Sequence, residues 1–577
     1  MSVDHRNYRD ANPTTEPLWH ELWGLDNTGQ TIYQGRPGSG GTPDADIDGR
    51  QALGITTGDP SVVVAVIDDG VDFSHPDLAA RAWTNPGESG NGKETNGIDD
   101  DGNGYIDDVH GWDFCHNDNT VHDFGSDFHG THVSGTIAAS LDGVGVVGVA
   151  PGVSIMALKF IGPESTCSLD SQAIAAIAYA RSFGVRIANA SWGSTDTQAN
   201  AQPLYDAIKT SGMLFVAAAG NVGADNDLAG PVAIPASFDL PNILSVAAVD
   251  NTGGLASFSN FGATTVDIAA PGVGILSALP ADATYPNPGW GWLEGTSMAA
   301  PHVTGSAALV ASMWPSLGAD PIALKARLLA SGKPDDVTTG LTVTGRIVDP
   351  FRALDVVGPV AAAPSGFAFV PGSIMSSTSI ATRIGWPNAT DDHTGVAAYG
   401  LEVQANGGSW TRVIRATTDR SGLWPLAFGT DYAFRVRARD AAANWGSWAT
   451  SAGVMPARYQ ESSSLIKYHG SWGRVRTISA SGGRTRFATH RNASVSLQFS
   501  GRAVGVIAPV GPTGGSVRLY VDGVYVSTIN LYRSRVAPRI VVAARAWSVS
   551  GVHTVTLVVI GTARHPRVEI DAFAVVP

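Results

Sequence analysis

Up to about residue 357, short apolar runs alternate with longer Ala-rich segments, and this alternation limits the folds open to the chain. The runs SVVVAVID, SIMALKF, RIANASWG, LFVAAAGN and ILSVAAVD are separated in part by SLDSQAIAAIAYARSFG and AQPLYDAIKTSG. Strands that are apolar throughout suit a parallel sheet covered on both faces, and the segments between them have the length of crossover helices. An α/β fold built on a parallel sheet is therefore predicted for residues 1–357.

The pattern changes after residue 357, where the Ala-rich segments stop. In YAFRVRARD, apolar side chains and arginines alternate from residue to residue, which is the period of a half-exposed antiparallel strand. A further such run is SVRLYVDGVYVSTINL, in which Asp522-Gly523 has the composition of a hairpin turn. We therefore expect two all-β sandwich domains after the α/β domain, at residues 358–456 and 457–577.

The 577 residues carry a net charge of −14 that is divided unevenly along the chain. Residues 1–358 hold 15 basic and 41 acidic residues, whereas residues 457–577 hold fourteen arginines and one lysine against four acids, a net charge of +11. Guanidinium groups pair with phosphate, sulfate or carboxylate, so one interpretation of the last domain is binding of an anionic polymer or polysaccharide. The other is a solvated basic face that docks on the acidic first domain.

No apolar run reaches the ~20 residues of a membrane helix, so no membrane span is expected. The first thirty residues lack the pattern of a signal peptide, but removal of such a peptide leaves the same appearance, and export is not excluded. The two cysteines, Cys115 and Cys167, lie in loop-like contexts and do not belong to C-x-x-C pairs. One disulfide between them is the favoured interpretation, and two free thiols are the alternative.

Three glycine-rich segments each place a reactive side chain at the end of an expected element. Asp68 ends the run SVVVAVID, His129 stands where an Ala-rich helix begins, and Ser297 stands at the start of another helix. A serine hydroxyl becomes a good nucleophile when an imidazole removes its proton, and a carboxylate fixes the tautomer of that imidazole. Taken singly, each residue is explained as a turn former or a helix cap, but their joint occurrence predicts a catalytic triad.

These segments, in the order VIDDG, HGTHVSG and GTSMAAPHV, resemble those of the subtilisin-like serine peptidases, the subtilase family, over roughly residues 14–357. The resemblance implies Asp68 as orienting carboxylate, His129 as general base and acid, and Ser297 as the nucleophile of a secreted endopeptidase that forms an acyl-enzyme. Asp69 departs from the family, which usually has a small hydroxyl residue there. A second carboxylate at this point is expected to raise the pKa of the histidine.

Two further segments resemble the family's substrate-binding parts. FVAAAGN resembles its oxyanion segment, which implies that the Asn221 amide donates to the tetrahedral intermediate beside the Ser297 N–H. NASWGS resembles the strand that pairs with extended substrate, and since neither segment contains an acid, we expect an apolar or broadly accepting specificity pocket. The residues expected to line the cleft are Ser191, Trp192, Gly193, Ala219 and Gly220.

The loop NGIDDDGNGYIDDVHGWDF is the densest acidic stretch and matches a calcium-loop pattern at several positions. His110 stands where that pattern has Glu, which argues against a helix-flanked EF-hand and leaves Asp108 or Asp113 to supply the missing oxygen. The alternative is a solvated acidic turn. The residues predicted to bind Ca²⁺ in this loop are Asp99, Asp101, Asn103 and Asp107.

A second calcium site is implied by the resemblance alone. Asp77 in SHPDL and Asp142 in SLDGVGVVG match positions at which many subtilases bind a structural calcium, together with carbonyl groups of residues 140–146. Ions at either place are expected to stabilise surface loops rather than to take part in acyl transfer.

Weaker resemblances concern the rest of the chain. Residues 358–456 resemble a fibronectin type III domain, interpreted as a spacer, and residues 457–577 resemble β-sandwich carbohydrate-binding modules more loosely. Together they imply a peptidase with C-terminal domains for substrate or surface targeting, from which the family's inhibitory N-terminal prosegment has been removed. The rival hypothesis is an adhesion or matrix-binding protein on a subtilase scaffold, and the complete triad argues against it.

His129 and His132 stand three residues apart, a spacing that by itself suits a metal site on one face of a helix. The triad gives the pair different roles. His129 must stay free of metal to accept the serine proton, whereas His132 lies one turn further along among small residues and is expected to be structural.

Overall fold

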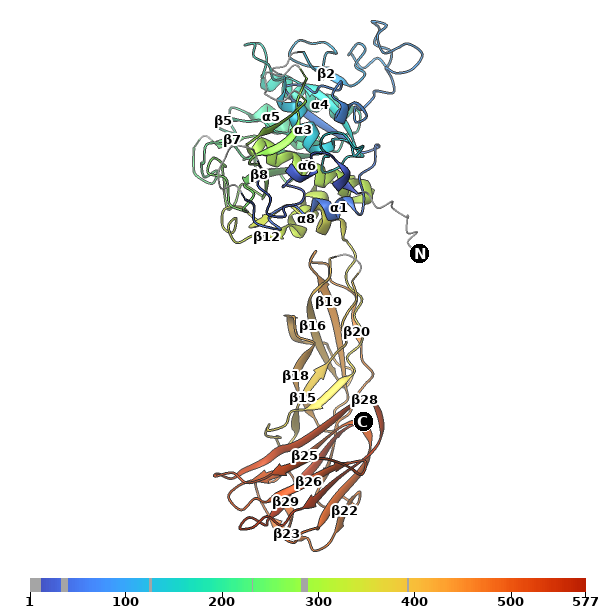
Figure 1. Cartoon of the computed structure of the whole chain (residues 1–577), viewed down its shortest axis with the longest axis vertical. Coiled ribbons are helices and arrows are strands. Elements are labelled where there is room, and N and C mark those ends of the chain that lie inside the picture. Colours follow the sequence, from blue (N-terminus) through green and yellow to red (C-terminus); the bar gives the residue numbers. More distant parts are fainter. Residues whose placement is uncertain (1–11, 33–39, 124–126, 231, 282–288, 392–393) are drawn as a thin grey trace. The chain divides into compact units, whose positions relative to one another are not determined.

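The computed structural model describes residues 12–32, 40–123, 127–230, 232–281, 289–391 and 394–577, and the chain divides into two compact units, residues 1–356 and 357–577 (Figure 1). The predicted boundary between residues 456 and 457 lies inside the second unit, so a division there stays a prediction. Among the described residues, none of the helices has both the length and the apolar character of a membrane span.

A nine-stranded sheet forms the centre of the first unit, in the order β12-β13-β9-β8-β6-β4-β1-β3-β2. From β13 to β2 the neighbours pair in parallel, and β12 pairs antiparallel with β13. The central strands are buried over nearly their whole length, which explains their unbroken apolar runs. The strands are β1 (Val63–Asp68), β2 (Gly111–Asp113), β3 (Ser154–Lys159), β4 (Ile187–Ala190), β6 (Leu214–Ala218), β8 (Ile243–Val249), β9 (Ile268–Pro271), β12 (Lys333–Pro334) and β13 (Arg346–Ile347).

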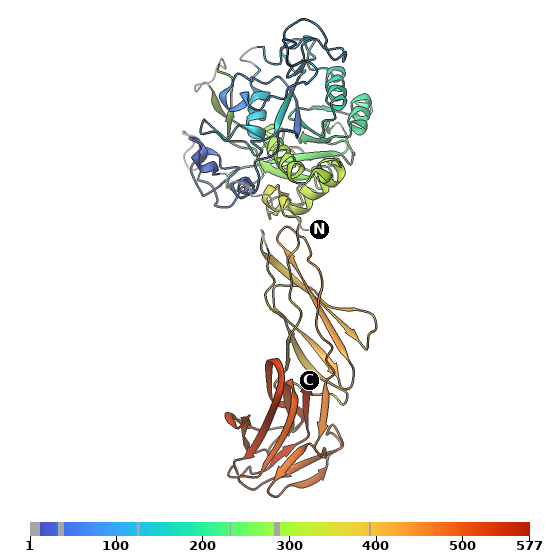
Figure 2. The same cartoon turned by 90° about the vertical axis from the view of Figure 1, so that its right-hand side faces the viewer.

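Helices cover both faces of this sheet (Figure 2). Val64 and Val66 on one face of β1 belong to the same buried cluster as residues of α3 and α6, and Ala65 and Ile67 on the other face cluster with residues of α4 and α5. Most residues of α6 are buried, which explains its small apolar composition. The helices are α3 (His129–Ala138), α4 (Asp170–Ser182), α5 (Gln202–Thr210) and α6 (Thr296–Met313).

Shorter elements complete the first unit. The hairpin β10-β11 and the ribbon β5-β7 are antiparallel pairs apart from the main sheet. These elements are η1 (Pro13–Thr15), η2 (Trp19–Glu21), α1 (Gly49–Leu53), α2 (Pro76–Ala79), β5 (Ser194–Asp196), β7 (Val232–Ile234), β10 (Ile275–Ala278), β11 (Trp290–Leu293), α7 (Pro315–Gly318), α8 (Pro321–Ser331) and α9 (Pro350–Leu354).

The second unit consists of antiparallel sheets. The first two are β14-β15-β18 and β17-β16-β19-β20, and burial alternates along β19 as its sequence predicts. Their strands are β14 (Gly366–Phe369), β15 (Ser379–Gly385), β16 (Val396–Ala405), β17 (Thr411–Thr417), β18 (Ser421–Ala427), β19 (Tyr432–Asp440) and β20 (Ala449–Thr450).

Two more sheets lie further along the same unit, a seven-stranded sheet built around β25 and the three-stranded sheet β23-β24-β29. The predicted hairpin turn at Asp522 and Gly523 joins β26 to β27, and both residues have positive φ. The strands are β21 (Ala457–Gln460), β22 (Ile466–His469), β23 (Gly473–Arg476), β24 (Arg484–Ala488), β25 (Ser494–Val510), β26 (Ser516–Val521), β27 (Val524–Asn530), β28 (Ala537–Val559), β29 (Val568–Ile570) and β30 (Ala572–Val576).

The two all-β regions share buried surface. Phe367 and Phe369 of β14 belong to one hydrophobic cluster with Ile507 and Val541 of the later strands. Backbone hydrogen bonds also join the two regions: the N–H of Gly372 donates to the carbonyl of Val541 over 2.8 Å. The predicted fold class, an α/β parallel sheet followed by all-β sheets, is confirmed, and the shared core explains why residues 357–577 form one compact unit.

Candidate active site

The predicted site residues gather at one edge of the parallel sheet. β1, β4 and β6 are parallel neighbours, and at their carboxyl ends stand Asp68, Ser191 and Asn221. The carboxyl edge of a parallel sheet is where α/β proteins usually bind ligands. α3 and α6 are attached to these strand ends through their first turns, which brings His129 and Ser297 to the same edge.

Asp68 and His129 form a direct hydrogen bond. Nδ1 of the imidazole donates to Oδ1 of Asp68 over 2.7 Å, and this carboxylate is buried whereas the histidine side chain is 28% exposed. The bond fixes the tautomer that leaves Nε2 free to accept a proton, and Nε2 has no hydrogen-bond partner within the described residues. Asp68 therefore holds the neutral imidazole of His129 in the tautomer that a general base needs.

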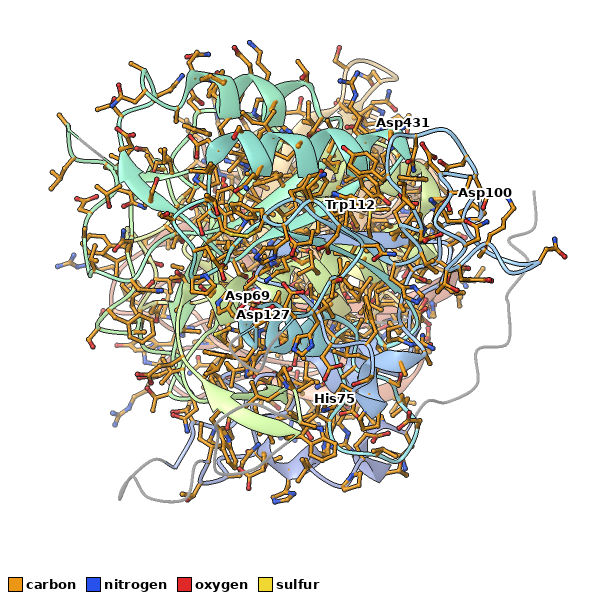
Figure 3. All side chains as sticks on the ribbon, turned by 90° about the horizontal axis from the view of Figure 1, so that it is seen from above. Asp69, His75, Asp100, Trp112, Asp127 and Asp431 are labelled. Atoms are coloured by element: carbon orange, nitrogen blue, oxygen red, sulfur yellow. A yellow bond between two sulfur atoms is a disulfide. The ribbon has the colours of Figure 1, made fainter. Side chains whose placement is uncertain are left out.

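Asp69 caps the helix that carries His129. Its carboxylate accepts the N–H of His129 over 3.0 Å and the N–H of Gly130 over 2.6 Å. Its carbonyl accepts from Lys159 over 2.9 Å, and the same ammonium donates to Asp127 over 2.8 Å; the labelled side chains of Asp69 and Asp127 stand near each other in Figure 3. A carboxylate is favoured at a helix N-terminus, so Asp69 fixes the start of α3 against β1.

The two neighbouring carboxylates also set the protonation behaviour of the site. Burial, together with the charge of Asp68, raises the pKa of Asp69 to about 7. Burial opposes the charged form of His129, but the charge and hydrogen bond of Asp68, and then the charge of Asp69, outweigh it and raise the pKa of His129 to about 9. A histidine with this pKa is a stronger base, and it becomes free to act as the solution turns alkaline.

Ser297 is the second residue of α6 and is tied to the end of β4. Its Oγ donates to the carbonyl of Ser191 over 2.9 Å, and Oγ of Ser191 donates back to the carbonyl of Ser297 over 2.8 Å. In the part of the chain that the structure describes, the Ser297 hydroxyl has no hydrogen bond to His129. The hydroxyl must therefore turn away from Ser191 before His129 can take its proton.

Asn221 is oriented by the residue before the serine. Its Oδ1 accepts the N–H and the hydroxyl of Thr296 over 2.8 and 2.9 Å, and the same hydroxyl accepts the N–H of Gly220 over 3.1 Å. Nδ2 is thus left to donate to a bound group beside the N-terminus of α6. Gly295 precedes this helix with φ of 152°, which admits glycine far better than any other residue. Thr296, which the sequence analysis did not single out, fixes the amide orientation.

The five residues predicted to line the cleft differ in their surroundings. Trp192 packs edge-to-face on Phe160 with ring centroids 5.0 Å apart, so much of its ring belongs to the buried core. Ala219 is fully buried, while Gly220 is partly exposed. Gly193 is exposed and passes so close to the carbonyl of Ile234 that a Cβ would lie 2.7 Å from it. Glycine is therefore required there for the approach of β7 to the segment after β4.

His132 occupies a closed environment. It is fully buried, and its Nε2 lies 3.0 Å from the carbonyl of Ile275 and 3.1 Å from that of Gly291, which belong to the hairpin β10-β11. Burial lowers the pKa of His132 to about 3, so the ring is neutral and donates to these carbonyls. His132 therefore joins α3 to a hairpin and does not share a ligand position with His129.

Cys115 and Cys167 form a disulfide, with Cα atoms 4.8 Å apart. The bridge joins the loop after β2 to the loop that precedes α4. His116, beside it, places Nδ1 2.7 Å from Asp113 and 3.1 Å from Asp123, and the hydrogen bond to Asp113 raises the pKa of this histidine. An imidazole between two carboxylates that favour its charged form accounts for this group without a metal.

One candidate metal centre surrounds Asp77. Oδ2 of Asp77 accepts from the indole of Trp290 over 2.7 Å, and Oε1 of Glu16 accepts the N–H of Gly143 over 2.9 Å. The second oxygen of each carboxylate is buried with no hydrogen-bond partner, and burial, with added repulsion from Asp142, raises the pKa of both acids. Two orphaned carboxylate oxygens beside a third acid fit an oxygen-liganded cation such as Ca²⁺. Glu16 was missed because it lies far away in the sequence.

The acidic loop brings Asp101 and Asp108, both named from the sequence, together with Glu88, which the sequence pattern does not include. Carboxylate oxygens of Glu88, Asp101 and Asp108 lie within 4.8 Å of one another; Glu88 and Asp108 are fully buried, and burial raises the pKa of both. Oε2 of Glu88 has no partner, which again fits a cation. Asn103 donates its amide N–H to Asp101 and to Asp108 over 3.3 and 2.9 Å, so its amide group is turned to serve as a donor in this cluster.

Asp99 and Asp107 do not join these three acids. The carboxylate of Asp99 accepts the N–H groups of residues 102, 103 and 104, and that of Asp107 accepts those of residues 96 and 97. Their oxygens close turns of the loop itself, as short acidic side chains commonly do. His110, at the last position of the sequence pattern, places Nδ1 2.7 Å from the carbonyl of Trp83 instead of facing the loop.

A buried carboxylate bonded to a histidine, with a serine at a helix start and an oriented amide beside it, is the arrangement of an α/β serine hydrolase. The model of the subtilase family matches residues 59–342. Subtilisin Savinase of Lederbergia lenta is 37% identical over 257 residues, which cover 44% of this chain and 78% of that protein. The alkaline protease of Alkalihalobacillus alcalophilus is 37% identical over 257 residues, covering 44% of this chain and 55% of that protein.

A solved structure described as a cold adapted subtilisin-like serine proteinase is 28% identical and covers 57% of this chain and 98% of that chain, with a TM-score of 0.41. The matched family model ends at residue 342, before the second unit begins. On the sequence match, the chain belongs to the subtilase family. It is accordingly a serine endopeptidase, with subtilisin-type peptidase activity.

The Asp69→Ser change is expected to shift the pH dependence of catalysis. Serine still caps α3 but removes one negative charge near His129, so the pKa of His129 falls and the acidic limb of kcat/KM against pH moves to lower pH by about one unit. Stopped-time assays of peptide hydrolysis from pH 5 to 11 measure this limb. Asp206→Asn on α5, which is exposed and caps nothing, is the matched control and should leave the limb in place. An unmoved limb in Asp69→Ser contradicts the role of Asp69.

Proposed function

We propose that Asp68, His129 and Ser297 act as a catalytic triad in peptide-bond hydrolysis. The observation that carries the proposal is the hydrogen bond from His129 to the buried Asp68, at the sheet edge where Ser297 begins a helix. In this proposal His129 accepts the proton of Ser297 as the oxygen attacks the scissile carbonyl carbon. The same imidazole then protonates the leaving amine, and water hydrolyses the acyl-enzyme by the reverse roles.

The negative charge that develops on the oxygen of the tetrahedral intermediate is stabilised by hydrogen-bond donors that already point toward it. The proposal gives this task to Nδ2 of Asn221 and to the N–H of Ser297 at the start of α6. Extended substrate then lies along Ser191, Trp192 and Gly193, with Ala219 and Gly220 behind the specificity pocket. These segments contain no acid, so an apolar or broadly accepting pocket remains the proposal for the residue before the cleaved bond.

Replacement of Asn221 tests this part of the proposal. Asn221→Ala is expected to lower kcat by about 10²- to 10³-fold with KM changed little, because the amide acts on the transition state and not on bound substrate. Steady-state hydrolysis of one soluble peptide separates the two constants. Thr296→Val, which keeps the shape but removes the hydroxyl that orients the amide, is expected to lower kcat by a smaller factor. A rise in KM at constant kcat contradicts the assignment.

Calcium binding is proposed at two places. The first combines Glu16, Asp77 and Asp142 with carbonyl groups of residues 140–146, and the second combines Glu88, Asp101 and Asp108. The support is of the same kind in both: two buried carboxylates whose pKa is raised, Glu16 and Asp77 in the first and Glu88 and Asp108 in the second, and carboxylate oxygens without a hydrogen-bond partner. A bound Ca²⁺ offsets this repulsion and thereby stabilises the loops. It takes no part in acyl transfer.

Removal of calcium is therefore expected to destabilise the protein. At free Ca²⁺ one hundred times the Kd, a site that binds only the folded state adds about 2.7 kcal/mol to the free energy of unfolding. Calorimetry of the Ser297→Ala chain, which cannot digest itself, should show a lower Tm in chelator and recovery with Ca²⁺ but not with Mg²⁺ at equal ionic strength. Glu16→Gln and Glu88→Gln should each remove part of the recovery. A Tm that chelator does not change contradicts both sites.

The remaining proposals concern the location of the protein relative to the cell and the role of the second unit. We propose export of the protein, with an N-terminal prosegment as inhibitor, and a targeting role for residues 357–577 toward substrate or a surface. A fibronectin type III-like spacer over residues 358–456 and a separate basic domain over residues 457–577 remain part of this proposal. The net charge of +11 in the last segment supports an anionic polymer as its partner.

A further inference from the structure

Four arginines lie directly opposite one another on the small sheet β23-β24-β29. Arg474 of β23 is paired in register with Arg486 of β24, and Arg476 is paired with Arg484. Residues two apart in a strand, and residues directly opposite in an antiparallel pair, point to the same side of a sheet. All four guanidinium groups therefore rise from one face, which we call the arginine face.

The arginine face lowers the stability of the folded sheet. Like charges directly opposite one another destabilise a strand pair, and here two such pairs are adjacent. None of the four makes an ion pair within the described residues, and three of them are exposed. Nε of Arg486 is buried with no hydrogen-bond partner. Repulsion of this kind is relieved when an anion binds between the side chains.

Three of the four acids of residues 457–577 are paired with groups outside the arginine face. Glu569 is paired with Arg567 over 2.9 Å, Asp571 accepts from Ser481 over 2.7 Å, and Asp522 lies 2.8 Å from Nδ1 of His553. The fourth acid, Glu461, is buried, and burial together with the charge of Asp571 raises its pKa, although the charges of Arg486 and Arg484 act in the other direction. The protein itself therefore leaves the arginine face positively charged.

Another row of arginines in the same unit lies, by contrast, against aromatic rings, although Nε of Arg437 also lacks a hydrogen-bond partner. Arg435 and Arg437 on β19 each stack on Trp448, at 4.6 Å from the ring centre, and Arg435 also pairs with Glu402 over 2.6 Å. Stacking on indole rings and pairing with an acid use up these guanidinium groups. Alternating arginines do not by themselves make a binding face. Arg474, Arg476 and Arg484 differ from this row because they are exposed and have no ring contact or ion pair within the described residues, whereas Arg486 stacks on Tyr468.

The dimensions and surroundings of the face favour one kind of polyanion. Strand spacing of about 4.8 Å and a two-residue repeat of about 6.6 Å place the four groups in a compact patch. Duplex DNA is commonly held through about 6 to 10 phosphate contacts, more than this patch offers. Single strands need free aromatic faces, but Tyr468 is covered by Arg486 at 4.3 Å, and Phe487 by Arg567 at 3.9 Å. Sulfate or carboxylate groups on adjacent sugars can be bound by the positive charges of the arginines alone, without a free aromatic ring.

We propose that the arginine face, Arg474, Arg476, Arg484 and Arg486, binds an acidic polysaccharide through its sulfate or carboxylate groups. The inference rests on the proposed targeting role of the second unit and gives that role a binding site and a ligand class. Guanidinium forks bind carboxylate and sulfate in pairs of hydrogen bonds, and their charge draws the polymer despite the net charge of −14 on the whole chain. The acidic first unit is then held beside whatever peptide substrate the polymer carries.

The test uses the full chain with Ser297→Ala, so its outcome does not depend on peptidase activity. Binding to heparin, to polygalacturonate and to a mixed-sequence DNA duplex is measured by surface plasmon resonance at low and moderate salt. The four-residue variant R474Q/R476Q/R484Q/R486Q is expected to weaken binding to both polysaccharides by about tenfold or more, because four ion pairs are lost. Moderate salt should have a similar effect.

The control variant R518Q/R533Q/R535Q/R545Q removes the same charge at four exposed arginines of the same unit, and its affinity should change less than about twofold. If circular dichroism shows that the four-residue variant is unfolded, Arg474→Glu is compared with Arg518→Glu, and the first should weaken binding more. Equal loss in variant and control, or no binding by the parent chain at low salt, overturns the proposal. Tighter binding to the duplex than to either polysaccharide assigns the face to nucleic acid and also overturns it.

Discussion

Ser297→Ala is expected to lower kcat for peptide hydrolysis by on the order of 10⁶-fold while the protein stays folded. The change removes the attacking oxygen, and nothing else at the start of α6 replaces it, since Thr296 holds the Asn221 amide. The loss in stability should be about 1 kcal/mol, because the hydroxyl gives up one hydrogen bond, to the carbonyl of Ser191. Measurements of kcat with a soluble peptide and of Tm by calorimetry give both numbers.

A serine on the same helix supplies the control for this change. The hydroxyl of Ser306 is buried in α6 and donates to the carbonyl of His302 over 2.7 Å, far from the start of the helix. Ser306→Ala therefore changes the helix in the same chemical way and should leave kcat within about threefold, since it touches no reacting atom. Equal loss of kcat in the two variants, with both folded, contradicts the role of Ser297 as nucleophile.

The two histidines of α3 are expected to respond in opposite ways to replacement by alanine. His129→Ala should lower kcat by on the order of 10⁶-fold with little change in Tm, because its side chain is partly exposed. His132→Ala should lower the free energy of unfolding by about 3 to 5 kcal/mol, since it leaves a cavity and two carbonyl groups without their donor. Folded His132→Ala should keep kcat within about tenfold.

Chemical denaturation at several temperatures measures the stability of both variants, and active-site titration corrects kcat for the folded fraction. His132→Gln serves as a second variant if the alanine protein does not fold, because its amide can donate to one of the two carbonyls. Loss of the chemical step in a folded His132 variant, to the same extent as in His129→Ala, is incompatible with a structural role for His132. The same result supports instead a metal site formed by His129 and His132, which their three-residue spacing suggests.

The architecture was accessible from the sequence because it depends on local pattern. Apolar runs such as that of β1 are buried on both faces, and the alternation in β19 is visible residue by residue. The extent of the second unit was not accessible in this way. Its shared core forms between Phe369 and Val541, which are far apart in the sequence and carry no local signal of their contact.

The residues of the candidate site also differ in whether the sequence predicts their positions. Asp68, His129, Ser297 and Asn221 stand at ends of elements within recognisable segments, so their positions were predictable. Thr296, whose hydroxyl orients the Asn221 amide, is visible in the sequence only as the residue before the serine.

The acids at the candidate calcium centres show more clearly which contacts a sequence pattern does not predict. Glu16 accepts the N–H of Gly143, 127 positions away, and no short-range pattern reports such a contact. In the acidic loop, a spacing pattern counts Asp99 as a ligand, although its oxygens close the loop's own turns. Glu88, which lies outside the pattern, joins Asp101 and Asp108 instead.

Covalent labelling with a fluorophosphonate tests the central claim most directly. Mass mapping of the labelled full chain should find a single adduct on Ser297, formed faster as pH rises and His129 loses its proton. The adduct should be absent from Ser297→Ala and should form at least about 10³-fold more slowly in His129→Ala. An adduct that forms on the Ser297→Ala chain at the parental rate, or one mapped to another serine in the parent chain, contradicts the account.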